Sequence, residues 1–499
     1  MAGGSVRLFS VLVLCGFLVA TSMPVLPMET VSAYSPHDPI YISSDYDFTE
    51  ENGVVGGSGT SDDPYIISGW EISAASETAI KVSDTTASFI IRDIHITVNS
   101  GYYPIWITDA SGFTIEGCMI DGQGSSIIIW FCSDFSISGN TLGGSVIEGE
   151  SLALVAMMCT NFSIESNTIT MTDSYVTISY ADDFDISGNE APYSCLKIDY
   201  CTNGTIADNS VGRGIDLSGN PWLTDSIDIS GNTVNGRSII FVKNQDHAAF
   251  KDQTLGELIV FNCSSVDIEM LELNGDCGID IQFCDEVTVA NCTIIGAETG
   301  IMIEDCQNAT VARCTVRDSY RGIYAQTAES ITLSRNLIQG CNFSIQFDSY
   351  DALILENMIL DAFCGIAFES GVALICSNSF VNVTHGGLAV RPTISYSLIE
   401  WNAEYPIGGN YWSNYSGIDE QSGPGQDQEG SDGFCDTPYS SGMVTDYYPL
   451  FEIPDLEYGA AESPSSDGDI LLWTMIIGVL VGAGAIIAVM LNRRGRNPS

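Results

Sequence analysis

Basic residues are scarce in this chain of 499 residues. Lys and Arg together number 16, against 64 Asp and Glu, and the formal net charge is −48. Nucleic-acid binding depends on basic side chains that neutralise phosphate, so this balance excludes a nucleic-acid partner. Charged residues make up only 16% of the chain, whereas 45% of it is hydrophobic. Disorder requires low hydrophobicity together with charge, so the chain is predicted to fold.

Histidine is also scarce. The chain has four histidines, none of them in an H-x-H or H-x₃-H spacing: His37, His95, His247 and His385. A copper site needs His, Met or Cys side chains that converge. The close pair Met157 and Met158 lies in an apolar stretch, where core packing explains it. The residues themselves therefore do not indicate a copper site.

Both ends of the chain carry apolar segments. Residues 1–33 have a basic start, an apolar run and a small-residue cleavage site, which is typical of a signal peptide. Residues 470–491 carry no charge and are long enough to cross a bilayer as a helix. The arginines of residues 492–499 predict that this tail is cytoplasmic. Residues 454–469 read as an acidic linker. We expect a single-pass cell-membrane protein whose bulk is extracellular.

The middle of the chain is a repeat. Most steps between successive anchor residues are 20 to 24 residues long, and the exceptions are 27 before Asn167 and 39 before Leu271. The residue three before each anchor and the residue two after it are almost all aliphatic. The anchors are Trp70, Ile94, Cys118, Asn140, Asn167, Asn189, Asn209, Asn232, Leu271, Cys292, Cys314, Asn336, Asn357 and Asn378.

Each repeat holds short stretches of alternating apolar and polar residues, broken by Gly, Asn, Asp and Ser. Period 2 predicts strands with one buried face, and several short strands per repeat without helical spacing predict a parallel β-helix. We therefore expect an all-β protein with about fourteen coils over residues 70–400. Residues 34–69 are predicted to cap it, and residues 401–453 to close it.

A second column of small residues lies eight positions before the anchor. Its members are Ala110, Cys132, Cys159, Ala181, Cys201, Cys263, Cys284, Cys306, Ala328, Ser349 and Ser370. Exchange of Cys with Ala and Ser in this column indicates a tight buried corner. We favour mostly free thiols, which pack as small apolar groups, over a disulfide framework.

Two ends of the repeat region resemble the NosD-like right-handed β-helix family of archaea. The residues that carry the resemblance are 52–60 (NGVVGGSGT), 63–67 (DPYII), 409–415 (GNYWSNY), 436–439 (DTPY) and 446–450 (DYYPL). Residues 244–256, within the long step, resemble an insertion of such proteins. The resemblance implies right-handed coiling. It leaves the activity open, because such β-helices include sugar-binding proteins, sugar hydrolases and copper-site assembly factors.

One strand of each coil presents polar side chains outward, and these supply the enzyme candidates. Asp280 and Glu304 lie on adjacent coils, and sugar cleavage needs two carboxylates on either side of the bond. Arg313 and Arg335 lie one coil apart at the residue before the anchor. The alternative is that these charges only solvate an outer face.

The same outward face supplies the binding candidates. Trp106 and Trp130 lie on adjacent coils, and Tyr324 belongs to the equivalent strand of a later coil. Exposed aromatic side chains often anchor ligands, and a flat face of aromatic and amide groups suits an extended glycan. The alternative is that a loop or the N-terminal cap covers the two tryptophans.

An acidic segment near the C-terminus suggests a Ca²⁺ site. Its carboxylates belong to Asp427, Glu429, Asp432 and Asp436, among Gly, Gln and Ser. Oxygen ligands at short spacing suit Ca²⁺, but the EF-hand pattern is missing, so a solvated loop is the alternative. No cofactor is required by any pattern in the chain.

The sequence thus predicts a membrane-anchored β-helix at the cell surface that binds glycans or acts as a scaffold. Binding is favoured over catalysis. A polysaccharide lyase or glycoside hydrolase acting on the outward strand face is the alternative, and a NosD-like accessory factor for copper-site assembly is the third hypothesis.

Overall fold

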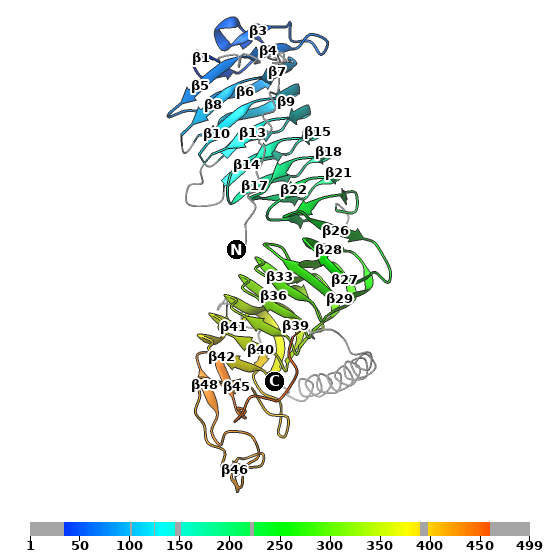
Figure 1. The fold of residues 1–499 in the computed structure, drawn as a ribbon, viewed down its shortest axis with the longest axis vertical. Helices are drawn as coiled ribbons and strands as arrows, with labels where there is room; N and C mark the ends of the chain where they lie inside the picture. Colours follow the sequence, from blue (N-terminus) through cyan, green and yellow to red (C-terminus); the bar gives the residue numbers. More distant parts are fainter. Residues whose placement is uncertain are drawn as a thin grey trace, which may run out of the picture.

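The computed structural model describes residues 34–99, 102–123, 125–144, 151–219, 224–389 and 398–459. These residues form an elongated all-β rod of stacked coils (Figure 1), which confirms the predicted parallel β-solenoid. The described residues include no helix long and apolar enough to span a bilayer. The predicted signal peptide and the predicted transmembrane segment lie outside the described residues.

The rod consists of an N-terminal stack, β1 to β25, and a C-terminal stack, β26 to β45. Each coil of the N-terminal stack contributes one strand to each of three faces. The face that carries the anchors contains β1 (Ser35–His37), β5 (Trp70–Ala74), β8 (His95–Val98), β10 (Met119–Gly122), β13 (Thr141–Gly143), β16 (Thr168–Ile169), β19 (Glu190–Ala191), β22 (Ser210–Val211) and β25 (Thr233–Val234).

The other two faces share the long strand β9 (Ile105–Glu116). The second face contains β2 (Ile40–Ile42), β6 (Ile80–Thr85), β11 (Ser125–Trp130), β14 (Ser151–Met157), β17 (Ser174–Ser179), β20 (Ser194–Asp199) and β23 (Ile215–Ser218). The third contains β3 (Val54–Gly56), β4 (Tyr65–Ser68), β7 (Phe89–Arg92), β12 (Ser133–Ser138), β15 (Thr160–Glu165), β18 (Asp182–Ser187), β21 (Thr202–Ala207) and β24 (Asp228–Ser230).

The C-terminal stack repeats this plan, with some strands bending across two faces. Its strands are β26 (Arg237–Lys243), β27 (Ala249–Leu255), β28 (Glu257–Phe261), β29 (Ser264–Asn274), β30 (Ile279–Gln282), β31 (Asp285–Ala290), β32 (Thr293–Ile295), β33 (Thr299–Glu304), β34 (Gln307–Ala312), β35 (Thr315–Arg317), β36 (Arg321–Ala328), β37 (Ile331–Ser334), β38 (Leu337–Gln339), β39 (Phe343–Leu355), β40 (Met358–Leu360), β41 (Cys364–Cys376), β42 (Ser379–Val381), β43 (His385–Ala389), β44 (Leu398–Glu400) and β45 (Tyr411–Trp412).

Short elements lie at both ends of the rod. The 3₁₀ turns η1 (Asp45–Asp47) and η2 (Glu50–Asn52) lie at the N-terminal end. The hairpins β46 (Gln421–Ser422) with β47 (Gln428–Glu429), and β48 (Tyr439–Ser441) with β49 (Val444–Asp446), lie at the other. The predicted cap segment is already part of the stack, because β1 pairs in parallel with β5 and β2 with β6.

Period-2 alternation places one side of every strand in the interior. In β9, Ile105 and Ile107 are fully buried, whereas Trp106 between them is half-buried on the outer side. The buried residues form two main clusters, one for each stack. All fifteen described cysteines are buried free thiols, as the column of small residues predicted.

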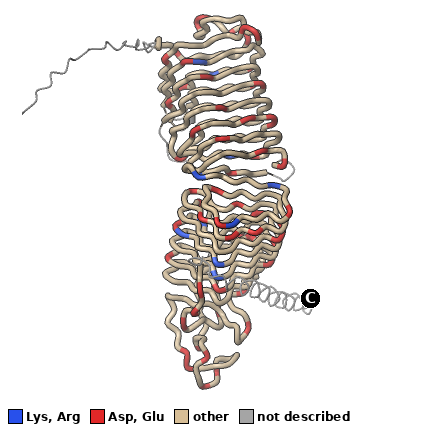
Figure 2. Tube along the Cα trace, turned by 45° about the vertical axis from the view of Figure 1, so that its right-hand side comes forward, with Lys and Arg blue, Asp and Glu red and all other residues tan. Residues whose placement is uncertain are grey.

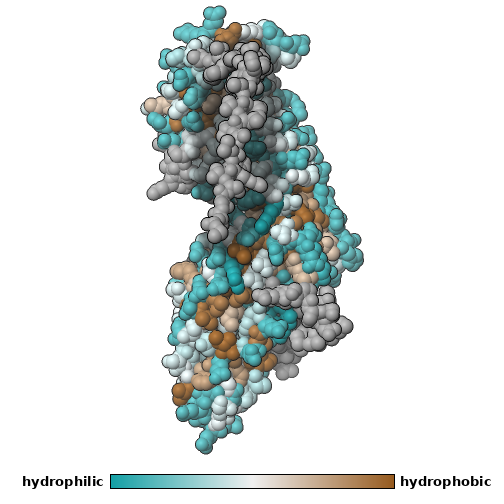
Figure 3. Space-filling view, viewed as in Figure 1, coloured by the Kyte–Doolittle hydropathy of each residue, from teal (hydrophilic) through white to brown (hydrophobic). Residues whose placement is uncertain are grey.

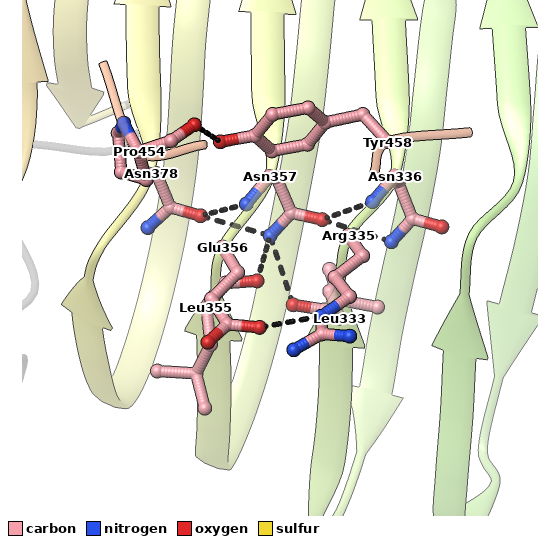
Figure 4. A network of polar contacts seen from close by, with 9 residues as sticks. All are labelled: Leu333, Arg335, Asn336, Leu355, Glu356, Asn357, Asn378, Pro454 and Tyr458. Atoms are coloured by element: carbon pink, nitrogen blue, oxygen red, sulfur yellow. Dashed lines mark hydrogen bonds and ion pairs between the residues drawn. The ribbon is translucent and has the colours of Figure 1, made fainter. Parts of the chain in front are cut away.

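The anchor asparagines form hydrogen-bonded ladders inside the rod. Asn357 donates from Nδ2 to the carbonyl of Leu333 and to Oδ1 of Asn378, both at 2.9 Å. Its own Oδ1 accepts the backbone N–H of Asn336 at 3.0 Å (Figure 4). Each side chain therefore satisfies buried turn groups of its own coil and of its neighbours.

Replacing Asn357 by alanine is expected to lower the free energy of unfolding by about 1–3 kcal/mol for each buried group left without a partner. Urea unfolding followed by circular dichroism measures this loss. Asn342→Ala is the matched control, because the Asn342 side chain is exposed. Equal effects of the two substitutions would contradict a structural ladder.

The long step before Leu271 contains a further coil, and the predicted insertion at residues 244–256 is part of it. Gln253 of β27 pairs with Leu271, so Gln253 occupies the anchor position. Phe250 and Leu255 are buried at the two flanking apolar positions. The anchor pattern missed this coil because glutamine replaces the usual asparagine, cysteine or aliphatic residue.

The two stacks meet at a waist where the rod narrows (Figures 1 and 3), and one sheet is interrupted there. β25 pairs with β26 as an antiparallel hairpin, through Val234 and Arg237. β26 then begins a new series of parallel pairs with β28. As a result β23, the last strand of the second face in the N-terminal stack, ends its sheet.

Candidate functional site

A cavity of about 290 Å³ lies at the waist, between the open edge of β23 and strands β28, β30 and β33. We call it the waist cavity. The interrupted sheet explains its position, because elsewhere in the stack the next strand occupies this space. A volume of this size is at the lower end of small-molecule sites.

Two side chains of the C-terminal stack satisfy the open edge of β23. Glu257 Oε2 accepts the backbone N–H of Ile215 at 3.0 Å. Gln282 Nε2 donates to the carbonyl of Leu217 at 3.1 Å. Both side chains are buried, so they replace the missing strand and join the two stacks. Burial raises the pKa of Glu257 well above its usual value, so its neutral form is favoured more strongly in the folded chain than in the unfolded one.

Asp280 is the carboxyl of the cavity whose surroundings most directly suggest a ligand. Its Oδ2 accepts from Gln282 Nε2 at 2.8 Å, whereas its Oδ1 is buried without a hydrogen-bond partner in the described part of the chain. Burial raises the pKa of Asp280 to about 7, and the nearby carboxyl of Glu304 contributes to the rise. A buried acceptor without a partner is costly unless a ligand or water satisfies it.

Two further carboxyls face the same space. Burial raises the pKa of Asp216 despite Lys197, whose Nζ lies 3.9 Å from its carboxylate. Burial also raises the pKa of Glu304. A carboxyl donates a hydrogen bond when protonated and only accepts when ionised, so raised pKa values extend the pH range over which these groups can donate.

Arginine and tyrosine side chains line the remaining wall. Arg213 Nη2 lies 3.3 Å from Glu298 Oε2. The guanidinium carbon of Arg213 lies over the ring of Tyr175, 5.3 Å from its centroid. Arg321 lies 5.2 Å from the ring of Tyr324. Met302 adds an apolar surface. The cavity thus combines arginines, carboxyls with raised pKa values and aromatic ring faces.

The structure brings together some of the predicted site residues. Asp280, Glu304 and Tyr324 line the waist cavity. Asp280 pairs in register with Met302 rather than with Glu304, so the two carboxyls are diagonal neighbours. Arg313 and Arg335 do not line this cavity. Arg335 binds Glu356, with Nε 2.7 Å from the carboxylate.

Sequence analysis missed the residues that reach the cavity from across the waist. They are Arg213 and Asp216 of the N-terminal stack, and Glu257 of the C-terminal stack was missed as well. No signal in the repeat places them, because the long step contains a further coil rather than a break in the period.

The predicted tryptophan pair lies away from the waist. Trp106 and Trp130 contact edge to face, with ring centroids 5.8 Å apart, and Lys81 Nζ lies 4.6 Å from the Trp106 ring. Both indole nitrogens are buried and have no hydrogen-bond partner among the residues that the structure covers. Ligand binding by Trp106 and Trp130 stays a prediction.

The acidic segment at the C-terminal end folds as a hydrogen-bonded loop. Asp432 Oδ2 accepts from the backbone N–H of Gly423 at 2.9 Å. Asp436 Oδ1 accepts two successive backbone N–H groups at 3.0 Å each. Asp427 and Glu429 are exposed. In the described ranges no group of three or more His, Cys, Asp or Glu is arranged to hold a metal ion, so the Ca²⁺ site has no support beyond composition.

The fold and the waist cavity define a parallel β-solenoid with a polar pocket in its flank. The profile of the family described as "Periplasmic copper-binding protein (NosD)" matches residues 56–234 and 211–417. This chain therefore belongs to the NosD family, as its two terminal motifs predicted.

No curated protein matches the chain. Among solved structures, the surface adhesin PfbA of Streptococcus pneumoniae is 11% identical, with 69% of this chain and 91% of that chain covered at a TM-score of 0.24. The A-module of mannuronan C-5 epimerase AlgE4 from Azotobacter vinelandii is 11% identical, with 74% and 88% covered at 0.23. The receptor-binding domain of the siphovirus 9NA tailspike is 8% identical, with 71% and 75% covered at 0.24. Likenesses this weak say nothing about activity.

The copper in the family's description does not fit the described residues. Among the residues that the structure describes, the ion-pair partners of His95 are Glu71 and Asp121, at 3.8 and 3.5 Å. Burial raises the pKa of Cys118 and of Cys132 to about 12, which disfavours the thiolate that binds a metal. No part of the function proposed below runs through copper.

Proposed function

We propose that this protein binds glycans and that the waist cavity holds a sugar. The observation that carries the proposal is Asp280, whose buried Oδ1 lacks a partner at the wall of a cavity that a small polar ligand can fill. A sugar ring presents hydroxyl groups at its edge and C–H groups on its faces. The carboxyls, Gln282 and the arginines suit the edge, and Tyr175, Tyr324 and Met302 suit the faces.

The negative net charge of the protein favours an uncharged sugar as the ligand. The chain carries a formal net charge of −48, and acidic residues are distributed along the whole rod (Figure 2). A polyanionic glycan would be repelled by this field. A neutral sugar would meet carboxyls whose pKa values burial has raised.

Sugar cleavage is the second candidate. It is favoured by the pKa of about 7 at Asp280, because glycosidases use one carboxylic acid with a raised pKa and a second carboxylate. Asp216 or Glu304 would supply the second group.

Cell-surface anchoring belongs to the same proposal. Removal of residues 1–33 and insertion of residues 470–491 would hold the rod outside the membrane, with residues 492–499 in the cytoplasm. Protease protection of the C-terminal tail in sealed vesicles tests this arrangement. The right-handed coiling that the family resemblance implies is also part of this proposal.

The test of glycan binding uses the full chain in mild detergent with a panel of neutral, acidic and amino-sugar polysaccharides. Retention on the glycan and release of reducing ends are measured together. We expect retention of neutral glycans by the wild type, and at least a tenfold weaker affinity for Asp280→Ala. Asp62→Asn, an exposed carboxyl at the N-terminal end, is the matched control.

The outcomes separate the two candidates. Retention without product supports a binding protein, whereas product release that Asp280→Asn abolishes establishes a hydrolase. No retention of any glycan, or equal retention by Asp280→Ala, would overturn the proposal for the waist cavity.

A further inference from the structure

A row of aromatic side chains runs along the C-terminal stack from the waist cavity. Its members are Tyr320, Phe343, Phe363 and His385, and we call it the aromatic ladder. Successive ring centroids are 5.7, 6.2 and 5.1 Å apart. The backbone N–H of Phe343 donates to the carbonyl of Tyr320, and that of His385 to Phe363, both at 3.0 Å. The rings therefore lie on consecutive coils.

The ladder is open to solvent. Tyr320 is 46% exposed and Phe363 is 48% exposed, whereas Phe343 between them is half-buried. Neighbouring rings meet edge to face, with interplanar angles of 77°, 86° and 79°. Burial in the core does not explain these exposed side chains. Figure 3 shows apolar side chains gathered on the C-terminal stack below the waist.

The ladder is continuous with the waist cavity. Arg321 lies between the two sites, 5.4 Å from the ring of Tyr320 and 5.2 Å from the ring of Tyr324. A second hollow of about 490 Å³ is lined by Tyr320 and shares Arg213 and Glu298 with the waist cavity. A ligand that leaves the cavity through this hollow reaches the first ring of the ladder.

We propose that the aromatic ladder binds the following units of a linear, uncharged glycan whose terminal sugar lies in the waist cavity. This inference rests on the proposed function, and it names the ligand as a polymer bound by its end. Tyr320 and Phe363 are two coils apart, which corresponds to about 10 Å along the rod. An extended disaccharide unit has about this length, so every second sugar stacks on an exposed ring.

Charge favours a neutral polymer over an acidic one. Asp318 lines the second hollow, and Asp361 lies on the solvent side of the coil between Phe343 and Phe363. A glycan with a carboxylate on every sugar would pass these groups at close range. An extended neutral glycan offers hydroxyl groups to them and apolar C–H faces to the rings.

The test measures affinity against chain length. Neutral cello-, manno-, malto- and chito-oligosaccharides of one to six units are titrated into the full chain by calorimetry, with oligogalacturonates as the acidic series. We expect affinity in at least one neutral series to rise with length beyond the first unit. Tyr320→Ala and Phe363→Ala should each weaken binding of the hexasaccharide by about threefold to tenfold and leave monosaccharide binding unchanged.

Tyr350→Ala is the matched control, because Tyr350 is 64% exposed and lies outside the ladder. Four outcomes would overturn the proposed role of the ladder. They are affinity that does not depend on length, equal losses for mono- and hexasaccharide, a preference for oligogalacturonates, and no binding of any series. If Asp280→Ala leaves hexasaccharide binding intact while Phe363→Ala weakens it, the aromatic ladder is the binding surface and the waist cavity is not part of it. If only monosaccharides bind and Asp280→Ala abolishes that binding, the waist cavity is the sugar site and the aromatic ladder binds no glycan.

Discussion

Replacing Asp280 by asparagine is expected to remove the pH dependence of glycan affinity. The pKa of Asp280 is raised from 3.8 to about 7, so its carboxyl is neutral below pH 7 and ionised above it. If the neutral form binds the sugar, apparent affinity scales with the neutral fraction. The wild type should therefore lose about tenfold in affinity between pH 6 and pH 8, as the neutral fraction falls. Asparagine is neutral at every pH and keeps an amide of similar shape.

The measurement is isothermal titration of the best neutral oligosaccharide at pH 5, 6, 7 and 8. Asp280→Asn should bind within about threefold of the wild type at pH 5 and show a flat profile, because it preserves hydrogen bonding. Asp280→Ala should bind weakly throughout. An affinity of the wild type that rises with pH, or an unchanged slope in the asparagine variant, would assign the titration to another group.

Replacing Glu257 by glutamine is expected to stabilise the protein above neutral pH, whereas replacing it by alanine destabilises the protein at every pH. The folded pKa of Glu257 is raised well above its usual value of 4.5, so the unfolded chain binds fewer protons than the folded one between the two values. The contribution of Glu257 to stability is thus fully present below its unfolded pKa and is lost as pH rises toward its folded pKa. Glutamine removes this slope and still accepts the N–H of Ile215.

Alanine leaves that N–H buried and without its partner, which costs about 1–3 kcal/mol. Urea unfolding at pH 5 and pH 8 measures both effects, and hydrogen exchange at Ile215 gives a local readout. Exchange at this amide should accelerate in Glu257→Ala and stay slow in Glu257→Gln. Glu71→Gln is the control substitution, because Glu71 is exposed in the N-terminal stack. A glutamine variant less stable than the wild type at pH 8 would show that the ionised carboxylate is the folded form.

The strand arrangement was predictable from sequence because every coil of a solenoid repeats the same pattern of buried residues. An aliphatic pair around each anchor, such as Ile354 and Ile359 around Asn357, is enough to place one buried corner per coil. Both residues are fully buried. The coil around Gln253 was missed because its anchor differs, although Phe250 and Leu255 fit the two apolar columns.

The candidate site was predictable only in part. Asp280 and Glu304 stood out because they face outward on adjacent coils, and both line the waist cavity. Arg213 and Asp216 line the same cavity from the N-terminal stack. Asp216 lies in β23, which pairs with neither of their strands, and Arg213 lies in the turn before β23. A repeat alignment compares residues that stack in register, so it cannot place side chains that meet across an interrupted sheet.

The sequence by itself determined that this protein is an acidic all-β solenoid with stacked asparagines and buried thiols, because short-range periodicity and residue type decide strands, turns and small corners. Only the tertiary structure decided where a site forms. The hairpin of β25 and β26 leaves the edge of β23 open, and buried polar groups must then compensate the missing strand. That long-range event brings Arg213 and Asp216 of one stack to the cavity that Asp280 lines in the other, and no local pattern in the chain encodes it.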